Sequence, residues 1–155
     1  MSDDSKEGEM ARRLARAEAA VADLAKSYVT WASADVEKCA EHLAVARADT
    51  DGRASAVRDL YAVAHNIKGQ GSSFGFPLMT RIGNSLCRLT RAKRPFGDGD
   101  LNIVQAHLDA MRLVLAQNIR GDGGPLGAKL SEKLEGMVVE LLGPEPQPEA
   151  DDLIR

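Results

Sequence analysis

The chain has few of the features that mark disulfide-rich, membrane or strongly charged proteins. Only two of its 155 residues are cysteine, too few for a disulfide framework, so we expect reduced thiols and a cytoplasmic protein. No apolar run approaches the roughly 20 residues of a membrane span, and the polar, acidic N-terminus lacks a signal-peptide core. A formal net charge of −3 gives no indication of nucleic-acid or membrane-surface binding.

Several motifs of catalysis are also missing. The sequence has no glycine-rich Walker loop, no GxSxG nucleophile elbow and no HExxH zinc motif. Cys39 and His42 have the spacing of two ligands on one helix face, but a zinc site needs three or four ligands. Sequence reasoning places neither Cys87 nor His107 beside them. We therefore expect this chain to hold no metal and no cofactor of its own.

Aromatic residues make up only 4% of the chain, β-branched runs are absent, and alanine and leucine are abundant, which together favour helices. Apolar residues recur every three or four positions in segments that glycine and proline separate. We predict an all-α fold, an antiparallel four-helix bundle with additional N- or C-terminal helices, because the connections are short. The expected helices cover 9–50 (as one helix or two), 53–73, 78–92, 100–120 and 126–142.

This pattern predicts one helical domain over residues 9–142, between a disordered tail over 1–8 and a flexible, proline-rich acidic tail over 143–155. In the first segment, a break over 30–33 is one alternative, because Thr30 and Ser33 could cap a helix start. The apolar stripe of that segment passes through Leu14, Ala17, Val21, Leu24, Tyr28 and Trp31.

The segment from His65 to Gly75 contains the most informative pattern. On a helix, Lys68 and Gly69 lie one turn above His65. A neutral imidazole is a nucleophile near neutral pH, and a lysine supplies a flexible positive charge for phosphate oxygens. Glycine inside a helix costs about 1 kcal/mol relative to alanine, so Gly69 needs a reason. One reason is the close approach of a partner's active site to His65; the other is helix packing beside a surface histidine.

Three nearby residues extend this candidate site. Tyr61 lies four residues before His65 and Ser72 seven residues after it, so both share its helix face and are candidates for a docking surface. Ser72 is equally consistent with a simple exposed serine. Gln70 either hydrogen-bonds the imidazole or is solvated at the surface.

The run His65-x-Ile-Lys68-Gly69, followed by Gly75 and by Leu86-Cys-Arg-Leu89 on the next helix, resembles histidine-containing phosphotransfer (Hpt) domains of bacterial phosphorelays. It is similar also to the phosphoacceptor domain of chemotaxis-type histidine kinases. The resemblance implies that His65 is phosphorylated and that Lys68 is its electrostatic partner. The motif covers about twenty-five residues, and the helical pattern extends the likeness over most of the chain.

The resemblance implies a phosphocarrier, which we expect to be a monomer. No ATP-binding or kinase domain is evident in the sequence, so we expect a carrier and not an enzyme. Phosphoryl groups would move between His65 and an aspartate of a response-regulator receiver domain, which would bring its own Mg²⁺. A histidine kinase or hybrid kinase would be the other partner. Chemotaxis-type domains have a glutamate near the position of Cys87 that fixes the histidine tautomer; its absence here favours the relay class.

Three other interpretations of the sequence remain open. The chain could be a helical adaptor or scaffold whose His65 is not phosphorylated. It could be an acceptor domain that a chemotaxis-type kinase phosphorylates in trans. The third, a hydrolytic enzyme with His65 as general base, has no companion nucleophile or acid in the sequence.

Overall fold

The computed structural model describes residues 2–145. All regular secondary structure in this part of the chain is helical, and it contains no strand. The prediction of an all-helical protein is therefore confirmed. No helix in the described region is both long and apolar enough to cross a membrane. The elements are α1 (Ser2–Ala48), α2 (Arg53–Gly71), the 3₁₀-helix η1 (Ser72–Phe74), α3 (Pro77–Thr90), α4 (Asp98–Ala116) and α5 (Gly124–Leu142).

The first helix is continuous over 47 residues, which answers the question of one helix or two. Thr30, one of the two candidate caps, instead donates its hydroxyl to the Lys26 carbonyl at 3.3 Å inside the helix. Residues 2–8 belong to α1, where the sequence predicted a disordered tail over 1–8. Asp3 and Asp4 lie in its first turn, where negative charge stabilises a helix N-terminus.

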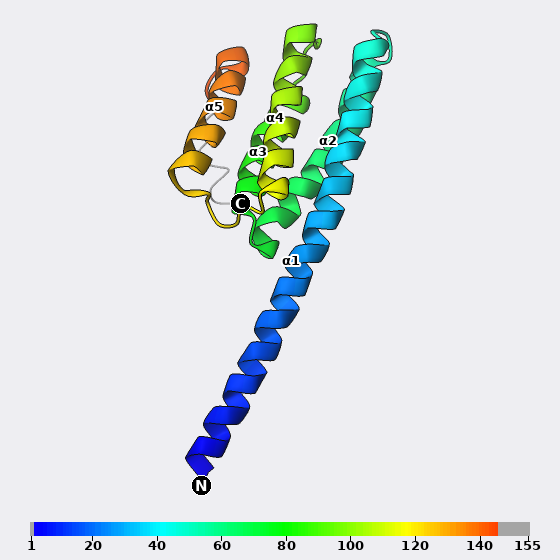
Figure 1. Cartoon of the computed structure of the whole chain (residues 1–155). Helices are drawn as coiled ribbons and strands as arrows, with labels where there is room; N and C mark the ends of the chain where they lie inside the picture. The colour runs from blue at the N-terminus through cyan, green and yellow to red at the C-terminus, as the bar shows by residue number, and fades with distance from the viewer. Residues whose placement is uncertain (1, 146–155) are drawn as a thin grey trace, which may run out of the picture.

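Residues 25–48 of α1 and the helices α2–α5 form the helical core. Within it, α1 packs on α2 and α4, α3 packs on α2 and α4, and α5 covers α3 and α4 (Figure 1). The largest fully buried side chains come from all four of the first helices and the α2–α3 connection: Tyr28, Leu43, Leu60, Ile67, Phe76, Met79, Ile82, Leu86, Leu89, Leu101, Leu108 and Met111. Residues 2–24 extend beyond this core (Figure 1).

The helix boundaries follow the local sequence closely. α2 ends two residues before its expected end because η1 follows it, and α3 begins at Pro77, one residue before its expected start. At the start of α4, the Asp100 carboxylate accepts a hydrogen bond from the Gly97 N–H at 3.0 Å. Most of the acidic tail predicted over 143–155 lies outside the described residues. The described Glu145 carboxylate lies 3.7 Å from the Arg91 guanidinium.

Candidate functional site

His65 lies on α2, and its side chain is exposed. The preceding residue, Ala64, is completely buried in the core. The ring of Tyr61, one turn earlier, lies with its centroid 6.0 Å from the imidazole centroid at an angle of 50°. Within residues 3–145, His65 makes no hydrogen bond or ion pair through its ring. The imidazole is therefore steadied on one side by an aromatic ring and is open to a partner on the other.

Lys68 is partly buried one turn beyond His65, and its backbone lies directly on α3. A Cβ added to Gly83 would lie 3.0 Å from the Cα of Lys68 and 3.1 Å from its Cβ. These distances are tighter than ordinary contacts, so a side chain at position 83 would require α2 and α3 to shift apart by a few tenths of an ångström. The base of the Lys68 side chain is therefore held by the α2–α3 contact.

The ammonium group of Lys68 has no carboxylate partner within the described residues. Cys87 lies on α3 and is a buried thiol. Burial raises the pKa of Cys87, and the positive charges of Lys68 and Arg91 oppose that effect. A thiol with a raised pKa is neutral near pH 7, so it leaves the positive charge of Lys68 uncompensated and available to an anion.

Gly69 is open to solvent in the described structure. A Cβ added there would meet no atom within 4 Å, apart from its own helix backbone. Gly71, two residues later, is the packing glycine: a Cβ there would lie 2.7 Å from the Thr80 hydroxyl oxygen and 2.8 Å from the Phe76 carbonyl oxygen. Among the described residues, helix packing therefore explains Gly71, which allows α2 to pack closely on α3, and it does not explain Gly69.

Thr80 is the residue of this region that the sequence analysis missed. Its hydroxyl donates to the Lys68 carbonyl at 3.0 Å and accepts from the Ser72 N–H at 2.8 Å. The Ser72 hydroxyl lies 3.0 Å from the same oxygen. Thr80 thereby fastens the last turn of α2 to the first turn of α3. Nothing in the local sequence signals this role, because it depends on bringing together residues eight and twelve positions apart.

The other predicted site residues divide by their surroundings. Ser72 is exposed, but its hydroxyl is engaged by Thr80, so its contribution to docking stays a prediction. Gln70 is exposed, and no hydrogen bond joins it to His65 among the residues described. Tyr61 is partly buried at the edge of the face that carries His65.

Positive charge surrounds a pocket of about 380 Å³ beside Tyr61. Its lining includes Arg58 on α2 and Arg91, Lys93 and Arg94 after α3. The charge is partly balanced, since Arg94 lies 3.5 Å from Asp100 and Arg91 faces Glu145. In a chain of net charge −3, this face near His65 is suited to an acidic partner surface.

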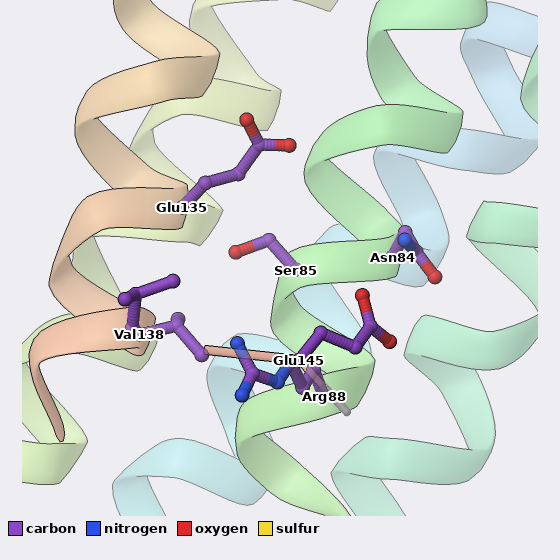
Figure 2. A pocket seen from close by; sticks show the side chains of 7 residues that line it. Asn84, Ser85, Arg88, Glu135, Val138 and Glu145 are labelled. Atoms are coloured by element: carbon purple, nitrogen blue, oxygen red, sulfur yellow. The ribbon is translucent and has the colours of Figure 1, made fainter. Parts of the chain in front are cut away.

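A second pocket, of about 150 Å³, lies between α3 and α5 and is separate from His65. Its lining includes Ser85 and Arg88 from α3 and Glu135 from α5 (Figure 2). The described residues contain no cluster of three or more histidine, cysteine or acidic side chains that could hold a metal ion, so Cys39 and His42 do not gain further ligands.

His107, which borders this region, is a structural histidine. It is completely buried, its Nδ1 lies 2.8 Å from the Ile103 carbonyl, and its Nε2 lies 2.8 Å from the Ser85 hydroxyl. A carbonyl oxygen only accepts, so Nδ1 carries the proton and the Ser85 hydroxyl donates to Nε2. Burial lowers the pKa of His107, which keeps the ring neutral. His107 is therefore unsuited to accept a phosphoryl group.

Comparison of the chain with family models, with curated proteins and with solved structures gives no match. The functional interpretation therefore depends on the geometry of α2 and α3 and on the motif that they carry.

The buried state of His107 predicts a pH dependence of stability. Its pKa in the folded protein is lower than the unfolded value of about 6.5, so the unfolded chain binds the extra proton first. The free energy of unfolding should therefore fall as the pH drops below about 6.5, and it should be insensitive to this group above that value. Urea titrations at several pH values between about 5 and 8, roughly the range in which histidine titrates, measure how the free energy of unfolding changes with pH.

His107→Gln provides the comparison, because the glutamine amide oxygen can accept from the Ser85 hydroxyl, as Nε2 does, without titrating. That variant should be less stable at neutral pH but should lose less stability on acidification to about pH 5. An equal acid slope in both proteins would show that His107 is not the responsible group.

Proposed function

We propose that this chain is a histidine phosphotransfer protein in which His65 carries a phosphoryl group to and from an aspartate of a receiver domain. The observation that carries the proposal is the combination of an exposed His65, a Lys68 one turn away with no carboxylate partner in the described part of the chain, and an open backbone at Gly69. The mutual contacts of α1, α2, α3 and α4 support the finer proposal for the fold, an antiparallel four-helix bundle with an N-terminal extension of α1 and an additional helix, α5.

The transfer step requires only a nucleophile from this chain. A lone-pair nitrogen of the neutral His65 ring forms a P–N bond as the P–O bond to the receiver's aspartate breaks, and the carboxylate leaves with the electron pair. Lys68 stabilises the negative charge on the phosphoryl oxygens before and after transfer. The receiver supplies the Mg²⁺ and the acidic pocket around it. In the reverse direction the same bonds break and form in the opposite order.

Cys87 bears on the choice between the relay class and a chemotaxis-type acceptor domain. Cys87 is not an acid, and no hydrogen bond among the described residues holds a ring nitrogen of His65, so nothing in the described structure fixes the imidazole tautomer. A kinase or hybrid kinase would act as the upstream partner in trans. The adaptor interpretation leaves two features without a use: the positive charge of Lys68, which has no carboxylate partner among the residues described, and the open Gly69.

The first prediction concerns His65→Gln. The variant should accept no phosphoryl group from a phosphorylated receiver or from phosphoramidate, because the nucleophilic nitrogen is gone. Its free energy of unfolding should change by less than about 0.5 kcal/mol, as is usual for an exposed position. Label incorporation and urea unfolding measure the two effects. Normal labelling of the variant would remove His65 from the mechanism.

The second prediction concerns the charge at position 68. Lys68→Ala should slow transfer between His65 and a receiver about tenfold, equivalent to about 1.4 kcal/mol in the barrier, without abolishing it. Lys133→Ala removes the same charge from an exposed position on α5 and should transfer at the wild-type rate. Rapid-quench measurement of the single-turnover transfer rate compares the two variants with the wild type. If both variants have wild-type rates, Lys68 has no electrostatic role.

The third prediction separates docking from folding at Gly69. Gly69→Ala should be neutral or stabilising by up to about 1 kcal/mol, because its Cβ would meet no neighbour. Gly69→Gln should also fold, but its longer side chain would stand where the receiver approaches His65. We expect slow transfer from a phosphorylated receiver and unchanged labelling by phosphoramidate.

Gly136→Gln is the matched control, because Gly136 is also an exposed helical glycine whose added Cβ would meet no atom within 4 Å. It should transfer normally with both donors. If Gly69→Gln loses labelling by both donors equally, or unfolds, the docking face has been misplaced.

A further inference from the structure

The N-terminal part of α1 has no packing partner within the described structure. From Asp3 to Leu24 every residue except Gly8 is exposed, and the first buried residue is Ala25. At 1.5 Å per residue, residues 2–24 extend about 35 Å along the helix axis (Figure 1). Helices of this kind are marginal in water unless they pack or carry many side-chain pairs. Among residues 3–24 the described structure has one ion pair, Arg13 with Glu9.

One face of this segment carries a regular apolar stripe. We define the stripe by five residues with alternating spacings of four and three: Met10, Leu14, Ala17, Val21 and Leu24. The four large side chains are 51–72% exposed. In heptad notation, Leu14 and Val21 are a positions and the other three are d positions, the pattern of a left-handed coiled coil.

The stripe meets the helical core at the next a position, Tyr28. Its ring is completely buried and stacks on Phe74 at a centroid distance of 5.3 Å. The same line of apolar residues therefore faces solvent up to Leu24 and enters the protein's own core at Tyr28. Trp31, the following d position, is again 50% exposed. A helix packed on the stripe would have to leave it near Tyr28.

The residues flanking the stripe favour one orientation of a second helix. Within residues 10–24, two of the four e and g positions are alanine, and the other two are Arg13 at g and Glu18 at e. In a parallel, in-register pair, a g residue faces the e residue of the following heptad on the other helix. Arg13 would then face the partner subunit's Glu18. An antiparallel pair would instead bring e positions together, with Glu18 near its own copy.

We propose that the stripe is a dimerisation surface on which a second copy of this chain packs as a short parallel coiled coil over residues 10–24. The interface is independent of the chemistry proposed for His65 and replaces the expectation of a monomer. It contains about two heptads, with a small alanine in one d position, so the dimer should be weak and concentration-dependent. The two copies of His65 would lie beyond the same end of the coiled coil.

Sedimentation equilibrium of the full chain over a wide range of protein concentration tests the interface. The wild type should show a monomer–dimer equilibrium. The double variant Leu14→Glu, Val21→Glu should weaken dimerisation at least about 100-fold, because it introduces facing charges at both a positions. The control Ala15→Glu, Ala19→Glu adds the same charge to exposed positions outside the stripe and should dimerise like the wild type.

Cross-linking tests the orientation. Met10→Cys should form a covalent dimer under mild oxidation, because a parallel register brings the two copies of residue 10 together, whereas an antiparallel pair would separate them by about 20 Å. Cys39 and Cys87 are buried and have raised pKa values, so the wild type should not cross-link. Ala19→Cys, off the stripe, is the control and should cross-link poorly.

Three results would overturn the proposal. The first is a monomer at every concentration, and the second is equal weakening by the stripe variant and its control. The third is failure of Met10→Cys to cross-link in a dimeric sample. None of them affects phosphoryl acceptance by His65, so the failure of this proposal and that of the proposed function are distinguishable.

Discussion

The close contact between α2 and α3 is the constraint on which the rest of the site depends. Gly71 and Gly83 remove the side chains that would hold the two helices apart, and Thr80 joins them through the Lys68 carbonyl and the Ser72 N–H. Because the apolar face of α2 is buried against this contact and against α1, His65 is left on the outer side of the helix. The exposure of the nucleophile is thus a consequence of packing that involves none of its own atoms.

The same contact explains how one helix can serve both structure and chemistry. The backbone of Lys68 is confined by Gly83, while its ammonium group has no carboxylate partner in the described region. Gly69 is open, and Gly71, half a turn further, is closed. Two glycines two residues apart therefore have opposite roles, one toward solvent and one toward α3. In the function we propose, the open one admits the receiver and the closed one keeps the helix in place.

The sequence was sufficient for the helical class, for most helix boundaries and for the exposed position of His65, because these follow from apolar periodicity and from glycine and proline positions. It could not reveal Thr80, whose bonds depend on the spacing of two helices. Nor did periodicity distinguish the two parts of α1. Leu24 and Tyr28 belong to one stripe in the sequence, yet one is exposed and the other is fully buried. That difference arises only because the other helices of the core end before the stripe does.

The central claim is that His65 accepts a phosphoryl group, and the chemical stability and position of the label test it most directly. The full chain would be incubated with a receiver domain carrying labelled aspartyl phosphate, and the labelled product would be mapped by proteolysis at alkaline pH. The account predicts a label that is stable in base, lost in acid, and confined to the peptide that contains His65. A chain that takes no label from any receiver or from phosphoramidate, or that carries its label on a different residue, would contradict it.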